Sequence, residues 1–155
     1  MKTKFILILF LTVISFVSAQ GQELPPKHRG MHPRLQKDGK VVDEKGKQLG
    51  YITKDGKVCD VTGKTIGIIA RTGEVTAANS KGIIGVIQKD GSFKSKNGYV
   101  VTSGGDGTLM AAGKVVGHVD DAYKYKKHAC AVHCFFDEEY PEKEEVDSLI
   151  NQEQK

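Results

Sequence analysis

The sequence contains no tryptophan, and aromatic residues make up only 7% of its 155 positions. Sites that stack the bases of single-stranded nucleic acid depend on exposed aromatic rings, so no nucleic-acid partner is expected. Cysteine is also scarce: Cys59, Cys130 and Cys134 allow at most one internal disulfide, which excludes a disulfide-rich scaffold. The Gly-x-Ser-x-Gly motif is absent, and no set of nucleophile, base and acid stands out. We therefore expect a protein that is not an enzyme.

Long hydrophobic runs are missing except at the start of the chain. Lys2 and Lys4 form a short positive region before an apolar stretch over 5–17, and the small residues Ser18 and Ala19 follow that stretch. This order is typical of a secretory signal peptide, with cleavage before Gln20. The run is shorter than the roughly 20 residues that a membrane-spanning helix needs, and no later segment is apolar enough to span a bilayer. We expect residues 1–19 to be removed and the rest to be exported to the periplasm or the extracellular space.

The net charge of +4 conceals opposite charges in two parts of the chain. Residues 137–155 carry eight acidic and two basic residues, a balance of −6, whereas residues 20–136 carry 19 basic and 11 acidic residues, a balance of +8. The basic excess is spread over many turns, which is typical of a solvated surface. A protein or an anionic surface is the kind of partner that this charge would alternatively attract.

Glycine recurs at a regular interval through the middle of the chain. Asp-Gly or a similar pair occurs five times, and the glycines of these pairs are 17, 17, 18 and 16 residues apart: Gly39, Gly56, Gly73, Gly91 and Gly107. An apolar residue lies two positions after each of them: Val41, Val58, Val75, Phe93 and Leu109. A second glycine marks a turn within each repeat: Gly46, Gly63, Gly82, Gly98 and Gly113. Asp-Gly supplies the positive φ of tight hairpin turns and Val and Ile favour strands. The sequence therefore predicts a mainly all-β domain of five tandem β-hairpin repeats over 37–120.

Four of the repeats carry a further glycine inside the second strand: Gly50, Gly67, Gly85 and Gly117. Glycine weakens a strand, so a repeated glycine there usually marks a close approach of backbones. We expect these structural glycines to face a crowded centre where the second strands converge around a pseudo-five-fold axis. Ring closure is favoured, and a linear β-roll is the alternative. The fourth repeat departs from the pattern, because the polar stretch 102–105 replaces the expected glycine and apolar residues.

These features resemble a known family. The signal peptide, the repeated units over 54–69 and the closing segment 126–136 are similar to 5-fold β-flower proteins, which are small exported proteins typical of Bacteroidetes. The resemblance covers about residues 37–136. It implies a fold with pseudo-five-fold symmetry, and it implies no activity and no catalytic residues. Where the family tends to have plain apolar residues near the end of the fold, this chain has a cluster of histidine and cysteine.

The segments that flank the repeats have different compositions. Residues 20–36 are polar and contain proline, which predicts an extended leader without a core of its own. Residues 121–136 predict a helix that caps the ring and plugs its centre, with a strand as the alternative. Their apolar residues recur at helical spacing: Ala122, Tyr125, Ala129, Val132 and Phe136. The acidic residues 137–155 predict a disordered tail or a loose helix over 142–151.

The histidine and cysteine cluster of the capping segment comprises His128, Cys130, His133 and Cys134. These are the residue types that bind zinc or copper, and on a helix the two cysteines are four residues apart and share one face. The spacing matches no standard zinc motif. Small buried cysteines beside partly exposed histidines are the simpler interpretation.

Two functions from different classes follow from these patterns. The first is an exported, non-enzymatic β-repeat domain that serves as a structural or interaction module of the periplasm or the cell surface. The second is a metal-binding protein that holds zinc or copper through His128, Cys130, His133 and Cys134. If the protein has a site, we expect it at the fourth repeat or at this cluster, the two departures from the repeated pattern.

Overall fold

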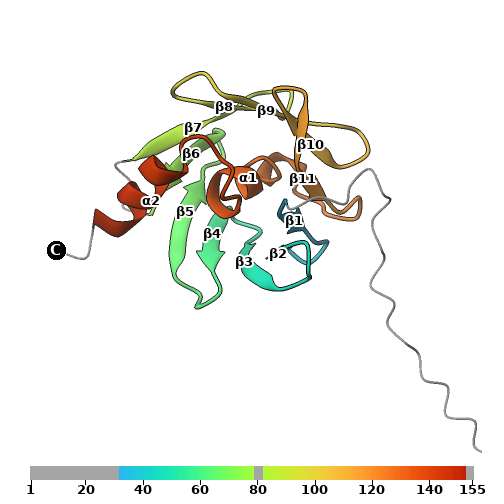
Figure 1. Ribbon diagram of the computed structural model, residues 1–155, viewed down its shortest axis with the longest axis horizontal. Helices are drawn as coiled ribbons and strands as arrows, with labels where there is room; N and C mark the ends of the chain where they lie inside the picture. The colour runs from blue at the N-terminus through green and yellow to red at the C-terminus, as the bar shows by residue number, and fades with distance from the viewer. Residues whose placement is uncertain (1–31, 79–81, 153–155) are drawn as a thin grey trace, which may run out of the picture.

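The structure is a computed structural model that describes residues 32–78 and 82–152. The predicted signal peptide and the leader up to residue 31 lie outside the described residues. Strands dominate the described part, and they surround a short helix, α1 (Ala131–Phe136), as Figure 1 shows.

Eleven strands form one closed barrel. Ten of them pair as successive hairpins: β2 (Lys40–Val42) with β3 (Gln48–Ile52), β4 (Lys57–Asp60) with β5 (Thr65–Ile69), β6 (Glu74–Ala77) with β7 (Ile83–Ile87), β8 (Phe93–Ser95) with β9 (Val100–Ser103), and β10 (Thr108–Ala111) with β11 (Lys114–Val119). Neighbouring hairpins also pair with one another, so each strand has two partners. Closure removes the free edges that a linear β-roll would leave, and the prediction of ring closure is confirmed.

The barrel is closed by β1 (Arg34–Leu35), which runs parallel to β11 and antiparallel to β2. These two residues were predicted to belong to a leader without a core over 20–36, and that boundary was wrong. Leu35 is only 1% exposed and belongs to the core. A strand of two residues is too short to produce an alternating pattern, so the sequence carried no sign of it.

The turns at one end of the barrel share one hydrogen-bond pattern. In the turn 53–56, the Gly56 amide donates to the Thr53 carbonyl at 3.0 Å and the Thr53 amide donates to the Lys57 carbonyl at 2.9 Å. The same pair of bonds recurs in the turns 36–39, 70–73, 88–91 and 104–107. Gly56 has a φ of 91°, whereas no aspartate of the described turns has a positive φ. This is a turn followed by one left-handed residue, the bulge type of hairpin, rather than a turn with two positive φ angles. We call this end of the barrel the Asp-Gly end.

The apolar residue two positions after each turn glycine points into the barrel. All five of these side chains have 0% exposure: Val41, Val58, Val75, Phe93 and Leu109. Burying one such side chain stabilises the fold by about 1.5–3 kcal/mol. The predicted two-residue spacing therefore identified an inner layer of the core.

The centre of the barrel is filled by residues 126–136, the later part of the segment 121–136 that was predicted to be a helix capping the ring and plugging its centre. It contains a 3-10 helix, η2 (Lys126–His128), and then α1 in the middle of the ring (Figure 1). A barrel of more than about eight strands encloses space that strand side chains alone do not fill. The helix is buried all round rather than along one apolar stripe, since Ala129 to Phe135 are all 2% exposed or less. We call residues 126–136, which contain η2 and α1, the plug of the barrel.

The in-strand glycines make room for large side chains inside the barrel. A β-carbon added to Gly67 would lie 2.2 Å from the Phe135 ring, and one added to Gly50 would lie 2.6 Å from the Phe136 ring. At Gly85 the nearest ring is that of Phe93, at 2.6 Å. The face was thus predicted correctly as crowded, and the predicted close approach of backbone is present at Gly50 and Gly85, where the nearest atoms are the carbonyl oxygens of Cys59 at 2.2 Å and Lys94 at 2.4 Å. The predicted convergence of the second strands was wrong. The glycines of β3 and β5 face the plug and that of β7 faces a core phenylalanine, because the interior is too wide for second strands to meet.

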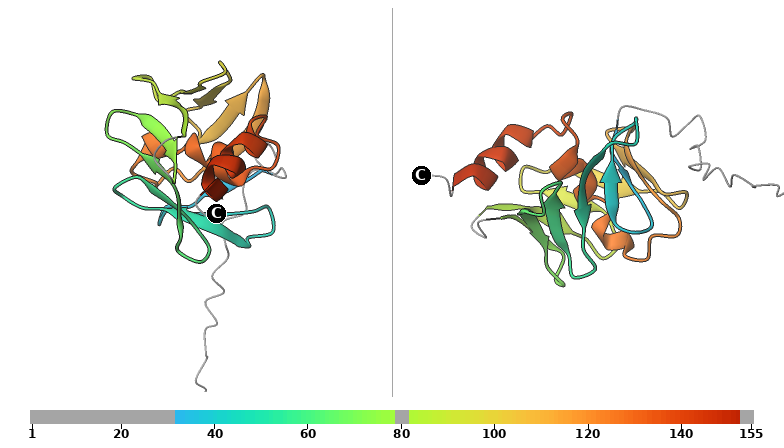
Figure 2. Two further views of the ribbon diagram at one scale, coloured as in Figure 1. Left: turned by 90° about the vertical axis from the view of Figure 1, so that its left-hand side faces the viewer. Right: turned by 90° about the horizontal axis from the view of Figure 1, so that it is seen from below.

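The acidic C-terminal residues leave the barrel at the end opposite the Asp-Gly end. Residues Lys143–Asn151 form α2, the helical alternative for the predicted tail, which lies outside the ring in Figure 2. Ser95 donates to Glu142 at 2.8 Å, and Lys96 forms an ion pair with Glu145. Leu149 fills the space beside Gly82, where an added β-carbon would be 2.5 Å away. Within residues 32–78 and 82–152, no helix is long and apolar enough to cross a membrane.

Candidate functional site

His128, at the end of η2, is the first residue of the predicted metal cluster. Its side chain is 1% exposed, and its Nδ1 lies 3.2 Å from the Tyr123 hydroxyl. The imidazole also stacks on Tyr125 with an interplanar angle of 11°. Burial, and secondarily Lys127, lowers the pKa of His128 to about 4. The residue is therefore a neutral core histidine, contrary to the interpretation that the histidines are partly exposed.

His133 belongs to a separate hydrogen-bond network. Asp137 Oδ2 lies 2.8 Å from His133 Nδ1 and 3.1 Å from His32 Nδ1, and Oδ1 accepts the Glu139 amide at 3.0 Å. Both imidazoles therefore donate from Nδ1 to one carboxylate. His133 Nε2 is left to accept from the Tyr99 hydroxyl, 3.1 Å away.

The Asp137 network holds segments of the chain together and does not activate a nucleophile. Burial alone would raise the pKa of Asp137, but the hydrogen bonds from His133, Glu139 and His32 outweigh it and lower the pKa. Burial raises the pKa of Tyr99, and Asp137 adds to the effect. The phenol therefore stays protonated, which is the opposite of what an activated nucleophile needs. The network ties the chain before β1 and the chain after α1 to the plug.

The two cysteines of the cluster also bind to the protein itself. The Cys130 thiol donates to the carbonyl oxygens of Gly91 at 3.4 Å and Val101 at 3.7 Å, and the Cys134 thiol donates to the Cys130 carbonyl at 3.6 Å. Burial raises the pKa of Cys130 to about 11 and also raises that of Cys134. All three cysteines, including Cys59, are buried free thiols.

The structure therefore does not bring the four predicted ligands to one point. His128, Cys130, His133 and Cys134 each contact a different partner. In the described parts of the chain, no three residues among His, Cys, Asp and Glu are placed to hold a metal ion. The predicted zinc or copper site has no geometric support among these residues.

The second predicted departure, in the fourth repeat, has a clear structural consequence. In the other repeats, the apolar residue at the end of the second strand donates its amide to the turn glycine. Ile52 donates to Gly39 at 2.8 Å, and the equivalent bonds are Ile69 to Gly56, Ile87 to Gly73 and Val119 to Gly107. In the fourth repeat this position is Ser103, because Phe93 pairs with Val101 as Val41 pairs with Gly50. The Gly91 carbonyl instead accepts the Cys130 thiol.

The end of β9 therefore stands away from the turn before β8. Ser103 is exposed, whereas its four equivalents are at most 7% exposed. A β-carbon added to Gly91 would meet nothing within 4 Å. At the four equivalent glycines it would lie 2.2 to 2.5 Å from a carbonyl oxygen at the end of the second strand of the same repeat. The fourth repeat is open where the others are closed.

A pocket of about 570 Å³ occupies this opening at the Asp-Gly end. It is lined by the turns 71–73 and 88–91, by Ile87, by Ser103 and the glycines of 104–107, and by Lys126 and Lys127. Its volume lies within the range of about 300–1,000 Å³ that small-molecule sites occupy. The pocket is the candidate functional site.

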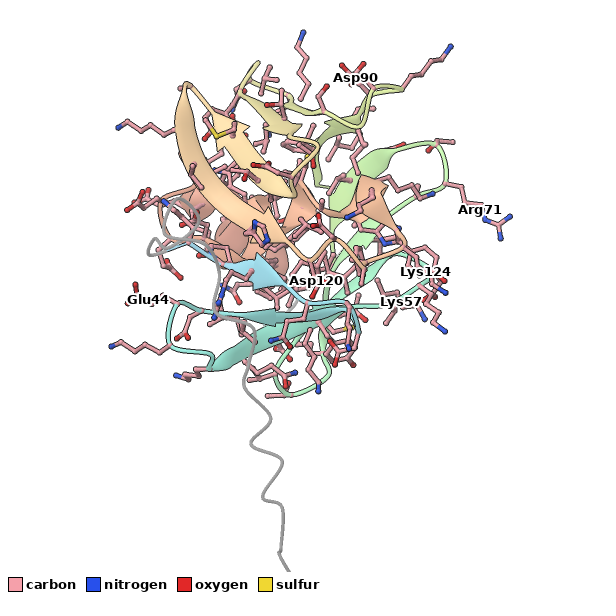
Figure 3. All side chains as sticks on the ribbon, turned by 90° about the vertical axis from the view of Figure 1, so that its right-hand side faces the viewer. Glu44, Lys57, Arg71, Asp90, Asp120 and Lys124 are labelled. Carbon is pink, nitrogen blue, oxygen red and sulfur yellow. The ribbon has the colours of Figure 1, made fainter. Side chains whose placement is uncertain are left out.

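The lining of the pocket is basic. It includes Arg71, Lys89, Lys126 and Lys127 against one acidic residue, Asp90. The Asp90 carboxylate accepts the Ser92 hydroxyl at 2.6 Å and the Ser92 amide at 2.9 Å, which lowers its pKa and occupies it within its own turn. In Figure 3, Arg71 and Asp90 lie at the tips of their turns and point outward from the barrel. The balance of charge favours an anionic ligand.

Several of these residues were not predicted from the sequence. Asp137 lies four residues after His133, which is the spacing of a side-chain pair on a helix, and this was the available signal. The second residue of four turns at the Asp-Gly end is basic: Lys37, Lys54, Arg71 and Lys89. Two of them, Arg71 and Lys89, line the pocket together with Lys126 and Lys127. This arrangement could not be foreseen, because it depends on where the plug enters the barrel.

Comparison with known proteins found no matching protein family, no matching curated protein and no matching solved structure. The resemblance to 5-fold β-flower proteins therefore remains a prediction, and the function is argued from geometry alone.

Proposed function

We propose that this protein is an exported, non-enzymatic β-barrel domain of the 5-fold β-flower type, which serves as an interaction module in the periplasm or at the cell surface. The observation that carries the proposal is that the buried polar groups of the plug are already engaged with the protein. His128 bonds to Tyr123, and Asp137 holds both His133 and His32. Groups that are fixed in this way stabilise the fold and leave recognition to the turns at the barrel ends.

The pseudo-five-fold symmetry is supported by the turns of the Asp-Gly end. Their two hydrogen bonds recur in all five turns, and their glycines are 16 to 18 residues apart. A repeated scaffold that presents equivalent turns at one end is suited to binding, since each turn can vary without disturbing the barrel. Interaction is therefore favoured over catalysis.

Export is tested by expressing the full chain in a bacterial host and separating the cellular fractions. The expected product is found outside the cytoplasm and begins at Gln20 when its N-terminus is sequenced. A cytoplasmic product that retains the first 19 residues would contradict export.

The absence of catalysis is tested separately on the purified mature protein. Chromogenic phosphate, glycoside and carboxylate esters should show no turnover above that of a heat-denatured control. Turnover that is lost in a His133→Gln variant which keeps the wild-type melting temperature would contradict the proposal, because it would assign chemistry to the plug.

A further inference from the structure

The pocket of the fourth repeat is a local opening in an otherwise closed pattern. In four repeats the end of the second strand covers the turn glycine, whereas in the fourth repeat Gly91 is open and Ser103 is exposed. Below this opening, the buried Cys130 thiol donates to the carbonyl oxygens of Gly91 and Val101 and so connects the plug to the turn before β8 and to β9. The opening is therefore built into the packing of the plug against β8 and β9.

The charged groups of the pocket come from three separate parts of the chain. Arg71 belongs to the turn between β5 and β6, Lys89 to the turn between β7 and β8, and Lys126 and Lys127 to η2. Lys126 is partly committed, because its Nζ donates to the Asp120 carbonyl at 3.1 Å. The remaining three cations, Arg71, Lys89 and Lys127, come from three elements that border the opening and give it an excess of positive charge.

We propose that this pocket binds a small molecule through a phosphate or sulfate monoester group. Several cations match an oxyanion with several acceptor oxygens. In the turn 104–107, the Gly104 and Gly107 amides donate within the turn itself, and the Gly105 amide is not used in those two bonds. A volume of about 570 Å³ admits a carrier of the size of one or two sugar rings rather than a polymer. Ile87 and the glycine faces supply apolar contact for that carrier. The assignment deepens the interaction role proposed above and rests on it.

The test is a titration of the mature protein followed by amide NMR. The small-molecule probes are inorganic phosphate and glucose 6-phosphate, with glucose as the uncharged control. Phosphatidylcholine vesicles with and without phosphatidylglycerol test for binding to a lipid surface. We expect saturable shifts at the amides of Gly91, Gly104 and Gly105 with the two phosphate compounds and none with glucose. We also expect glucose 6-phosphate to bind more tightly than phosphate, because the sugar adds contact with the pocket wall.

Two double variants locate the binding. Lys89→Ala with Lys127→Ala removes two cations of the pocket and leaves Lys126 on its carbonyl. Lys45→Ala with Lys47→Ala removes the same charge from exposed lysines at the opposite end of the barrel. The pocket variant should weaken glucose 6-phosphate binding about tenfold and the control less than about twofold, in line with two partly exposed charge contacts. Equal melting temperatures would show that both variants fold.

Three results would overturn the proposal. The first is the absence of saturable shifts with both phosphate compounds. The second is equal weakening in the two double variants, which would indicate general charge attraction rather than a pocket. The third is binding only to vesicles that contain phosphatidylglycerol, which would assign the basic end to a lipid surface. None of these results depends on the export and turnover experiments, so the interaction role can survive the loss of this ligand.

Discussion

Replacing Gly67 by alanine tests the central feature of the fold, which is a barrel closed around a helical plug. Gly67 lies in β5 with an ordinary strand conformation, so alanine introduces no backbone strain. Its new β-carbon would lie 2.2 Å from Cζ and 2.5 Å from Cε1 of Phe135. Phe135 is 2% exposed and has no solvent side to which it can move.

The expected cost follows from this overlap. The β-carbon would be more than about 1 Å inside the carbon–carbon contact distance of about 3.5 Å. Adding a methyl group to a packed core costs about 1–3 kcal/mol, and the better strand entropy of alanine returns about 0.5–1 kcal/mol. We expect Gly67→Ala to lower the free energy of unfolding by about 1–2 kcal/mol, and the melting temperature by several degrees.

The measurement is urea unfolding of the mature protein, followed by circular dichroism. Gly105→Ala is the matched control, because its β-carbon would meet nothing within 4 Å. It should stay within about 0.5 kcal/mol of wild type or be slightly more stable. A double-mutant cycle with Phe135→Leu then isolates the contact, since the smaller side chain relieves the overlap. We expect a coupling energy of at least about 1 kcal/mol.

Two outcomes would refute the reasoning. If Gly67→Ala is as stable as Gly105→Ala, the barrel interior at β5 is not filled as the structure places it. If the effects of Gly67→Ala and Phe135→Leu simply add, the cost does not arise from the plug. In either case the explanation of the repeated in-strand glycines would fail.

Three further predictions concern the plug and its anchors. Because burial lowers the pKa of His128 to about 4 from 6.5, the unfolded chain binds a proton that the folded one excludes. Stability should therefore decline by up to about 3 kcal/mol as the pH falls from 6.5 to 4, and His128→Gln should flatten this part of the profile. Asp137→Asn should cost about 2–3 kcal/mol in urea unfolding, since His133 and His32 lose their anionic acceptor; a cost no larger than that of Glu139→Gln would contradict the anchor. Ellman's reagent should detect no thiol in the native protein and three in urea, because every cysteine is buried; a rapid native reaction would contradict this packing.

The repeats were readable from the sequence because their signals are local. A turn glycine and an apolar residue two positions later determine one turn and one inward side chain, as at Gly56 and Val58. Such a signal survives without knowledge of the rest of the fold. The strand over 34–35 carried no such pattern, and its place in the barrel depends on β11, more than 80 positions along the chain.

The sequence indicated where the candidate sites lie along the chain, but not how their side chains are arranged. The loss of the glycine pattern in repeat four indicated an irregularity, and the pocket lies there, but its cations come from turns and from η2 that meet only in the folded barrel. The histidine and cysteine cluster had suitable residue types, yet spacing along a segment does not say which way each side chain points. Residues 128–135 of the plug are buried on every side, so their polar groups turn to different walls of the barrel.

The sequence by itself determined the unit of this protein: its turn chemistry, the alternation of its strands and the period at which both repeat. Each of these depends on interactions within a few residues, which any copy of the unit carries with it. The tertiary structure decided what fills the ring, because eleven strands enclose more space than their own side chains occupy. That requirement placed α1 at the centre, matched Gly67 to Phe135, and left the fourth repeat open above Cys130.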